Sequence, residues 1–418
     1  MTDAAPRTDW RAPAMARRVQ RRYAAERRFR LLGLFAVIAS AGFLAFLLAN
    51  MLMNGAQGFL QTRLIVPVDF ARAALPLDAA RLRGPGADLA LAAAGLPDLA
   101  SEAARAAYGP RGPAMIADSG WTALRDALKR DPRLLAQRAM IAIPASAAFD
   151  QAAKGRGLPA DRALIDQLRA KGRIETGLST TFLFGADSTD PVQAGIWGAL
   201  KGSIFTMAVT LLLAFPIGVL AALYLEEYAP RNAVTDFIEV SINNLAAVPS
   251  IIFGLLGLAV FLNLFDLPRS ASLVGGMTLA LMTMPVIVIA GRNAIRGVPP
   301  SIRDAALGVG ASPIQVVFHH VLPLALPGIL TGTIIGMARA LGETAPLLMI
   351  GMRAFIATPP DRLTDPATVL PVQIFLWSDE IDRAFIEKTS AAIIVLLIFL
   401  LAMNSVAVYL RNRFETRW

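Results

Sequence analysis

The chain contains no cysteine and only two histidines, His319 and His320, among its 418 residues. The missing cysteine excludes disulfide bonds, thiolate metal sites and cysteine nucleophiles. Two adjacent histidines are too few for a metal site built on histidine. Charged residues are also scarce, at 17%, against 55% hydrophobic residues. A soluble protein of this length needs more polar surface, so the composition predicts an integral membrane protein.

Positive charge gathers at the N-terminus. Arginines recur from Arg7 to Arg30 and stop where the uncharged run 31–52 begins. A basic segment can bind nucleic acid, but one beside an apolar run follows the positive-inside bias of membrane proteins. We therefore expect no nucleic-acid partner, a cytoplasmic tail at 1–30 and a first transmembrane helix at 31–52. The run exceeds the roughly 7–15 apolar residues of a signal peptide, which favours an uncleaved anchor.

Six apolar windows are long enough to cross about 30 Å of hydrocarbon at about 1.5 Å per helical residue. If the N-terminus is inside, the arginine-containing interruption 292–323 and the C-terminal RNRFETRW also fall inside. The loop 226–236 falls there too, although it is net acidic. The sequence thus predicts a multi-pass protein with both termini in the cytoplasm. The windows are 31–52, 199–225, 237–264, 272–291, 324–350 and 390–410.

A long segment, 53–190, separates the first two windows and is placed outside the cell by this topology. Two stretches in it are predicted to be helical, LPDLASEAARAAY and SGWTALRDALKRDPRLLAQRAM. Ser119 is a suitable cap for the second. Apolar residues then recur at helical spacing, at Trp121, Leu124, Leu128 and Leu135. We expect a mainly helical extracytoplasmic domain, in which no motif indicates chemistry.

The interruption between the fourth and fifth windows has the pattern of two short helices. Pro299-Pro300 cannot continue a helix, and Ser301 has the capping-box spacing to Asp304. A helix is therefore expected from Ser301 to near Gly310, because glycine readily adopts the left-handed conformation that ends helices.

A second short helix is expected after that glycine, with Ser312 as cap and Pro313 at the first position. Pro323 is expected to end or kink it. Two small helices at the membrane surface suit either a connecting hairpin or a docking surface for another protein. The expected apolar face of the second helix consists of Ile314, Val317, Phe318 and Val321.

Two charged residues, Arg339 and Glu343, lie inside the fifth window. They are four positions apart, so a continuous helix places them on one face. Ionised groups are costly within the bilayer and therefore mark a pathway or a partner. The alternative is an ion pair that only fixes packing. Glycines at 332, 336 and 342 are expected to let neighbouring helices approach closely.

An oxyanion path explains both side chains. Arg339 can bind an oxyanion through two parallel hydrogen bonds. Glu343 can accept a hydrogen bond from the P–OH of phosphate, a group that sulfate lacks, or it can hold Arg339 in position. Arg292, on the cytoplasmic side of the fourth window, is a further path candidate, with an interfacial anchor as its alternative role.

The interruption resembles the EAA loop of ABC-transporter permeases, the cytoplasmic element that docks onto an ATPase. Asp304 replaces the glutamate of that pattern and His320 replaces its isoleucine. The string RALGETAPLL, together with DPVQAGIWGALKGSIFTMAVTLLLAFPIGVLAALYLEEYAP, resembles phosphate-uptake permeases of the PstA type. The resemblance covers about 191–418, whereas 53–190 exceeds the minimal family pattern.

This resemblance implies an all-α membrane fold with an ABC type I permease core of five transmembrane helices in 191–418 and an EAA loop at 299–323. Implied partners are a sister permease subunit, an ATPase dimer and an extracytoplasmic phosphate-binding protein, in the lipid of the bacterial inner membrane. No G-x-x-x-x-G-K-[ST] string occurs, so ATP and Mg²⁺ are expected in the partner ATPase and no cofactor in this chain. The implied ATPase-coupling residues are Asp304, Ala305, Ala306, Gly310, Leu322 and Pro323.

The expected function is therefore the permease subunit of an ATP-driven phosphate importer, which is not an enzyme itself. A permease for sulfate or molybdate is one alternative. A sensor that reads a ligand with 53–190 is another. A membrane enzyme is disfavoured, since the apolar windows offer no cluster of histidines or carboxylates for catalysis.

Overall fold

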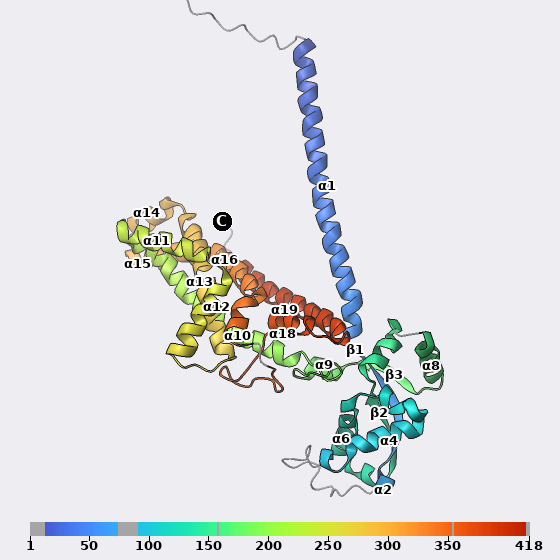
Figure 1. The fold of residues 1–418 in the computed structure, drawn as a ribbon. Helices are drawn as coiled ribbons and strands as arrows, with labels where there is room; N and C mark the ends of the chain where they lie inside the picture. Colours follow the sequence, from blue (N-terminus) through green and yellow to red (C-terminus); the bar gives the residue numbers. More distant parts are fainter. Residues whose placement is uncertain (1–12, 74–90, 157–158, 353–354, 415–418) are drawn as a thin grey trace, which may run out of the picture. The chain divides into compact units, whose positions relative to one another are not determined.

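The computed structural model of the chain describes residues 13–73, 91–156, 159–352 and 355–414 (Figure 1). It divides into two units, Met1–Met53 and Asn54–Trp418. The first unit is the greater part of helix α1, Pro13–Gly58. This helix includes the basic residues from Arg17 to Arg30 and the predicted span 31–52, because arginine and alanine are good helix formers. Its apolar side chains are exposed, as Phe35 is at 70%, which suits a helix surrounded by lipid.

The second unit begins with an insert, residues 59–184, that contains a three-stranded antiparallel sheet. Strand β1, Leu60–Asp69, lies between β2, Arg138–Pro144, and β3, Ile174–Leu178. Ile65 of β1 pairs with Ala142 of β2. The helices of the insert are α2 Phe70–Ala73, α4 Leu96–Tyr108, η2 Gly109–Arg111, α5 Gly112–Met115, η3 Asp118–Gly120, α6 Trp121–Arg130, η4 Pro132–Ala136, α7 Ala147–Gln151, η5 Ala152–Arg156, α8 Pro159–Ala170 and α9 Thr180–Phe184.

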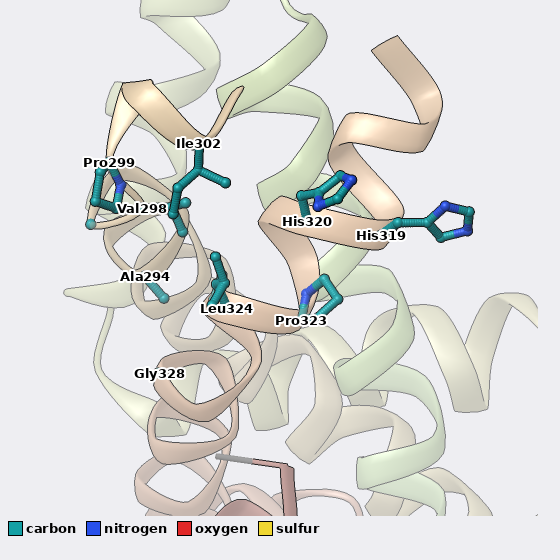
Figure 2. Close-up of a pocket in the computed structure, with 11 residues that line it drawn as sticks. Ala294, Val298, Pro299, Ile302, His319, His320, Pro323, Leu324 and Gly328 are labelled. Carbon is teal, nitrogen blue, oxygen red and sulfur yellow. The ribbon is translucent and has the colours of Figure 1, made fainter. Parts of the chain in front are cut away.

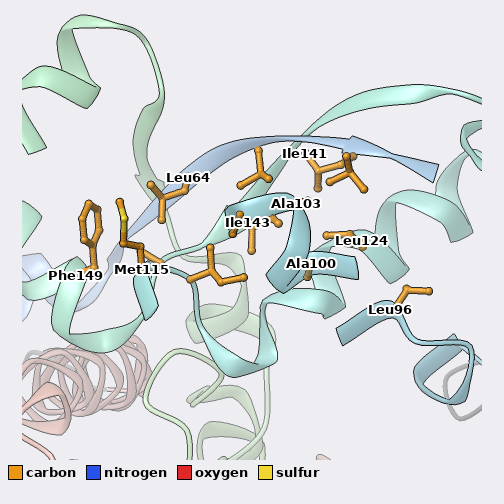
Figure 3. Packing of buried hydrophobic residues seen from close by; sticks show 14 of the residues in the cluster. Leu64, Leu96, Ala100, Ala103, Met115, Leu124, Ile141, Ile143 and Phe149 are labelled. Carbon is orange, nitrogen blue, oxygen red and sulfur yellow. The ribbon is translucent and has the colours of Figure 1, made fainter. Parts of the chain in front are cut away.

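One face of the sheet packs on the helices of the insert. Burial alternates along β1, so that Leu64, Val66 and Val68 all lie inward with no exposed surface. They share a core with Leu96 of α4 and Leu124 of α6, as Figure 3 shows. The insert is therefore a folded α+β unit with its own hydrophobic core.

The structure confirms one of the two helices predicted in this region in full. Helix α4 is the stretch LPDLASEAARAAY. The second prediction is wrong beyond Arg130, because Met140 lies in strand β2, where Ile141 and Ile143 bury their side chains in the core. Ser119 does not cap α6; its hydroxyl donates to Asp190.

The remainder of the second unit is a helical bundle. In chain order its elements are α10 Trp197–Leu223, η6 Tyr224–Tyr228, α11 Ala233–Ala246, α12 Ser250–Gly257, η7 Leu258–Leu264, α13 Ser272–Arg296, α14 Pro300–Gly308, α15 Pro313–Gln315, η8 Val316–Val321, α16 Leu322–Gly342, α17 Ala345–Met349, α18 Leu370–Ser378 and α19 Ala384–Phe414. Helices α11, α14 and α15 gather at one end of this bundle (Figure 1), here called the loop end. The end where α10 and α19 begin is called the insert end.

Among the described residues, five helices are long and apolar enough to span a membrane, or six if one bent pair is a single span. The mainly helical membrane fold is thus confirmed. The bent pair is the predicted span 237–264, which breaks by 102° between Ala246 and Ser250. Pro249 explains the break, because a proline disfavours helical backbone at the residue before it.

The predicted fifth span, 324–350, is also interrupted. Helix α16 ends at Gly342, Glu343 has extended backbone, and the short helix α17 follows. Close packing predicted from glycines holds at Gly332, where a Cβ atom would lie 2.1 Å from the Cβ of Ala290 on α13. It does not hold at Gly342, which has nothing within 4 Å.

Candidate functional site

The loop between α13 and α16 folds as two short helices around a glycine. Gly310 has a φ of +92°, the left-handed conformation that was predicted. Its N–H donates to the carbonyl of Leu307, and that of Ala311 donates to the carbonyl of Ala306. These bonds satisfy carbonyl groups left free at the end of α14. Ser312 caps α15 in a reciprocal capping box with Gln315, as the sequence favoured.

Two details of the loop differ from prediction. Helix α14 begins at Pro300 with no side-chain cap, so Ser301 does not form the expected capping box. Pro323 does not end the second helix, because the π-helical turn η8 continues directly into α16.

The predicted docking residues divide by exposure. Asp304 and Ala305 are exposed, whereas Ala306 is only 5% exposed and packs among residues of α13, η8 and α16. Beside them, Leu307 and Val309 present apolar side chains to the outside, at 50% and 86% exposed. The exposed face of α14 therefore offers a surface for a partner, while Ala306 holds the loop to the bundle.

A pocket of about 810 Å³ opens where the loop meets the bundle (Figure 2). Its wall is mostly apolar, and the two histidines of the chain, His319 and His320, line it from η8. Leu322 is half-buried and Pro323 is exposed at the start of α16. The remaining lining residues are Ala294, Gly297, Val298, Pro299, Ile302, Pro323, Leu324, Ala325 and Gly328.

A set of six charged residues joins the loop to the neighbouring helices and is here called the loop-end cluster. Its first part is a pair between Arg303 of α14 and Glu227 of η6, with Nη2 to Oε1 at 2.7 Å. Arg303 also donates to the carbonyls of Val298 and Ile295, at the end of α13. A cation at a helix C-terminus is favourable, since the dipole is negative there. The full cluster is Glu226, Glu227, Glu239, Arg292, Arg296 and Arg303.

The second part of the cluster holds the predicted path candidate Arg292. This side chain, only 10% exposed, donates from Nη2 to Glu239 at 2.8 Å and from Nε to Glu226 at 3.3 Å. Arg296 donates to the other oxygen of Glu226 at 2.8 Å and lies 4.0 Å from Glu239. Two arginines of α13 thus share two carboxylates, one from η6 and one from α11. The guanidinium of Arg292 is occupied by protein groups.

The predicted pair Arg339 and Glu343 comes together at the end of α16. Nε of Arg339 lies 3.6 Å from Oε1 of Glu343, a loose contact. The side chain of Arg339 is 49% exposed and that of Glu343 is 21% exposed. Because α16 ends at Gly342, the carboxylate belongs to the break before α17 rather than to the same helix face. Arg339 therefore presents donors at a surface of the bundle.

A second ionic group, missed by the sequence analysis, lies at the insert end. Lys154 of η5 binds Asp150 at 2.6 Å and Glu387 of α19 at 3.0 Å. Arg156 binds the other oxygen of Glu387 at 2.8 Å. These four residues, here called the insert-end cluster, fasten the insert to α19. The side chains of Lys154 and Glu387 are 6% and 4% exposed.

Asp187, in the segment between the insert and α10, is a further polar anchor. Its Oδ1 accepts hydrogen bonds from Gln373 and Trp377 of α18, at 2.9 and 3.0 Å, and from the N–H of Ser188. Burial raises the pKa of this carboxyl, and the hydrogen bonds from Trp377, Ser188 and Gln373 partly offset that rise. Asp187 thus ties the segment before α10 to α18.

One feature of the sequence indicated the loop-end cluster, namely an unexpected excess of acidic residues. The loop after the second window was net acidic where the topology expected a positive side, and Glu226 and Glu227 are part of that acidity. The structure shows that arginines of α13 and α14 neutralise them. Pairs such as Lys154 with Glu387, 233 positions apart, leave no comparable local signal.

The chain is similar to known membrane transport proteins. A family model described as a binding-protein-dependent transport system inner membrane component matches residues 214–418. A model described as a domain of unknown function, DUF3333, matches residues 16–161. The two matched ranges do not overlap.

Similar curated proteins include the probable ABC transporter permease protein YqgI of Bacillus subtilis, 34% identical over 47% of this chain and 71% of that protein. The phosphate transport system permease protein PstA of Haemophilus influenzae is 33% identical over 51% of this chain and 74% of its own length. PstA 1 of Mycobacterium tuberculosis is 31% identical over 52% and 70%.

Solved structures similar to the chain include inward-facing MetNI, a methionine ABC transporter. The similarity has a TM-score of 0.42 and 17% identity, over 53% of this chain and 98% of that one.

Proposed function

Since the chain belongs to the family of binding-protein-dependent transport system inner membrane components, the permease subunits of ABC transporters, we propose that it forms part of the phosphate path of an ATP-driven importer. Relatives named as phosphate transport permeases support phosphate as the substrate. The observation that carries the proposal is Arg339, a half-exposed guanidinium on a membrane-spanning helix, loosely paired with Glu343.

The chemistry of phosphate fits these two side chains. A guanidinium can donate two parallel hydrogen bonds to two oxygens of an oxyanion. A carboxylate beside it repels a fully ionised anion but accepts a hydrogen bond from P–OH, which phosphate carries at neutral pH and sulfate does not. The 3.6 Å separation leaves the pair weakly bonded, so both groups can turn to a passing ligand.

Arg292 does not share this role. Both Glu226 and Glu239 hold its guanidinium, and only 10% of the side chain is exposed. An anion at this site would have to displace two carboxylates that are already hydrogen-bonded. We assign Arg292 to the structure of the loop end.

The exposed face of α14 is the proposed contact with a partner ATPase, which would hold ATP and Mg²⁺. Asp304, Ala305 and Val309 are exposed there, next to the half-exposed Leu307. Small side chains let a partner's backbone approach closely, and isolated apolar ones supply contact area. Gly310, Leu322 and Pro323 shape the turn and the helix start that hold this face in place. ATP-driven closure of the partner would then move the loop and open the path alternately to the two sides.

The proposed assembly contains a sister permease, an ATPase dimer and an extracytoplasmic phosphate-binding protein, in a bacterial inner membrane. The loop end faces the cytoplasm, together with both termini, and the insert faces outward. The arginines of the loop and of the C-terminal segment agree with this orientation.

Uptake of labelled phosphate into proteoliposomes that contain the complete transporter and ATP tests the function. We expect uptake that excess sulfate does not compete. Competition by sulfate or molybdate would indicate another oxyanion permease, and absence of any oxyanion uptake, with ligand binding to the insert, would indicate a sensor.

Variants of the charged pair test the path. Arg339→Lys removes the two parallel N–H donors of the guanidinium, and Glu343→Gln removes the carboxylate that accepts from P–OH. Each is expected to lower uptake about tenfold or more, while the subunits still co-purify, since a lost charged hydrogen bond costs about 1.5–3 kcal/mol. Normal uptake by both variants would remove the pair from the mechanism.

Docking is tested by comparing two neighbours on α14. Ala305→Trp adds bulk to the exposed face and should release the ATPase from an otherwise intact permease. Ala306→Trp adds bulk to a buried site and should disturb the permease itself. Co-purification of the ATPase at the wild-type ratio with Ala305→Trp would contradict docking on this face.

A further inference from the structure

The short helix η6 lies between the arginines of α13 and the arginine of α14. Its two consecutive glutamates bind different elements. Glu226 receives hydrogen bonds from Arg292 and Arg296 of α13, and Glu227 receives them from Arg303 of α14. One turn of helix after α10 thereby contacts both the membrane-spanning helix α13 and the short helix of the docking loop.

Arg303 fixes the position of α14 through four hydrogen bonds. Nε and Nη2 reach Oε1 of Glu227, Nη1 reaches the carbonyl of Val298 at 2.7 Å, and Nη2 reaches that of Ile295 at 3.1 Å. The carbonyl of Ile295 belongs to the last turn of α13, and that of Val298 lies two residues after this helix. The carboxylate belongs to η6, which extends α10. A single side chain thus joins the docking helix to both long helices.

The contact is shielded from water. The side chain of Glu227 is 12% exposed and that of Arg303 is 23% exposed. Beneath it, Ala306 of α14 packs with Ile295, Val298 and Leu223 in one hydrophobic cluster. A partly buried ion pair is screened less by salt than an exposed one, so it retains its attraction while the helices move.

We propose that Glu227 and Arg303 are positioning residues that make the docking helix move as one body with the ends of α10 and α13, so that movement of α14 reaches the substrate path. This proposal rests on the proposed function. Glu226, Glu239, Arg292 and Arg296 extend the same connection to α11, the helix before the 102° bend.

The cleanest variant is Glu227→Gln. It removes the negative charge but leaves the bonds of Arg303 to the two carbonyls, so α14 keeps its place. We expect the phosphate moved per ATP hydrolysed to fall about fivefold or more, the lower end of typical coupling between sites. ATPase co-purification and the ATP hydrolysis rate should stay within about twofold of wild type.

A double-mutant cycle separates coupling from simple damage. Arg303→Gln should lower the same ratio, and the double variant should be no worse than the poorer single one, because both remove one connection. Arg303→Lys, which keeps the charge, should recover part of the ratio. The control is Asp361→Asn, which removes a carboxylate from an exposed pair with Lys201 at the other end of the bundle. A wild-type ratio in Glu227→Gln, or effects that multiply in the double variant, would overturn the proposal.

A second readout does not depend on the substrate. The chain has no cysteine, so spin labels can be placed on it at Ser301→Cys on α14 and Leu220→Cys on α10, both exposed. In the wild-type complex the distance between the labels should stay constant when ATP is added, and in Glu227→Gln its distribution should broaden. An ATP-dependent change already present in wild type would refute movement as one body, even if phosphate is not the substrate.

Discussion

The two ionic clusters of this permease differ in how their charges are shared. At the insert end, each oxygen of Glu387 has its own cation, Oε2 with Lys154 and Oε1 with Arg156. At the loop end, Arg292 and Arg296 divide the oxygens of Glu226 and Glu239 between them at distances from 2.8 to 4.0 Å. At the insert end each cation has its own carboxylate oxygen. At the loop end each arginine lies near both glutamates, so the arginines can exchange the oxygens that they bind.

The two clusters also differ in how much of their side chains is exposed to solvent. The side chains of Lys154 and Glu387 are almost completely buried, whereas Glu239 and Arg296 are 35% and 52% exposed. A buried pair that loses one member leaves an uncompensated charge in a poor solvent, while water can replace a lost partner at the surface. We infer that the insert-end cluster is a fixed attachment. In the loop-end cluster the pair of Arg303 and Glu227 stays bound, and only the contacts of Arg292 and Arg296 with the two shared carboxylates can exchange during transport.

The largest effect is expected from Glu387→Ala. It leaves the buried ammonium of Lys154 with one carboxylate, Asp150, and the carbonyl of Leu60, and it removes the carboxylate that binds Arg156. Breaking a buried pair costs about 3–5 kcal/mol, so the purified protein should melt at a much lower temperature, with the insert released from α19. Thermal unfolding in detergent and limited proteolysis of the insert measure both effects. If the melting temperature is unchanged, the insert is not held by this cluster.

Glu239→Ala at the loop end is expected to have a small effect on the same melting curve. Arg292 keeps its contact with Glu226, and the exposed side of the cluster is open to solvent. The pair of Glu239 with Arg296 is exposed and contributes about 0.2–1 kcal/mol, and water can reach the side of Arg292 that Glu239 leaves, so the curve should shift by little. A fall in melting temperature as large as that of Glu387→Ala would show that the loop-end cluster is as fixed as the insert-end cluster.

Local features of this chain could be predicted from its sequence. The amphipathic helix α4, the left-handed Gly310 and the cap at Ser312 depend on residues a few positions apart. Hydrophobic length identified the membrane spans, and short motifs identified the resemblance to PstA-type permeases, which the relatives confirm. The path and docking residues stay predictions, with Arg339 and Glu343 now placed beside each other.

Features that depend on distant contacts could not be predicted. The stretch that ends in Met140 was predicted to be helical throughout, but its last three residues, from Arg138, pair with β1 as the start of β2, because Ile141 and Ile143 fill the core of the insert. Tertiary packing outweighs local propensity at such a site. The bend of the third span has a local cause, Pro249, which the prediction of one continuous span 237–264 did not take into account.

Asp187 offers the smallest effect, since it is a partly buried carboxyl with no ion-pair partner among the described residues. All three of its hydrogen bonds reach Oδ1, an atom that asparagine retains. Asp187→Asn should therefore change stability by less than about 1 kcal/mol near neutral pH, whereas Asp187→Ala leaves the Trp377 N–H without an acceptor and should cost about 1–3 kcal/mol.

The pH dependence gives a sharper test of the same residue. Burial raises the pKa of Asp187 above its ordinary value of 3.8, so the folded protein holds this proton more tightly than the unfolded chain. Its contribution to stability is therefore greatest below pH 3.8 and is lost as the pH rises through the folded pKa. The melting temperature of the wild type minus that of Asp187→Asn should therefore decrease as the pH rises from 3.8 through the folded pKa of Asp187. A difference that grows instead would mean that the hydrogen bonds from Trp377 and Gln373 outweigh burial.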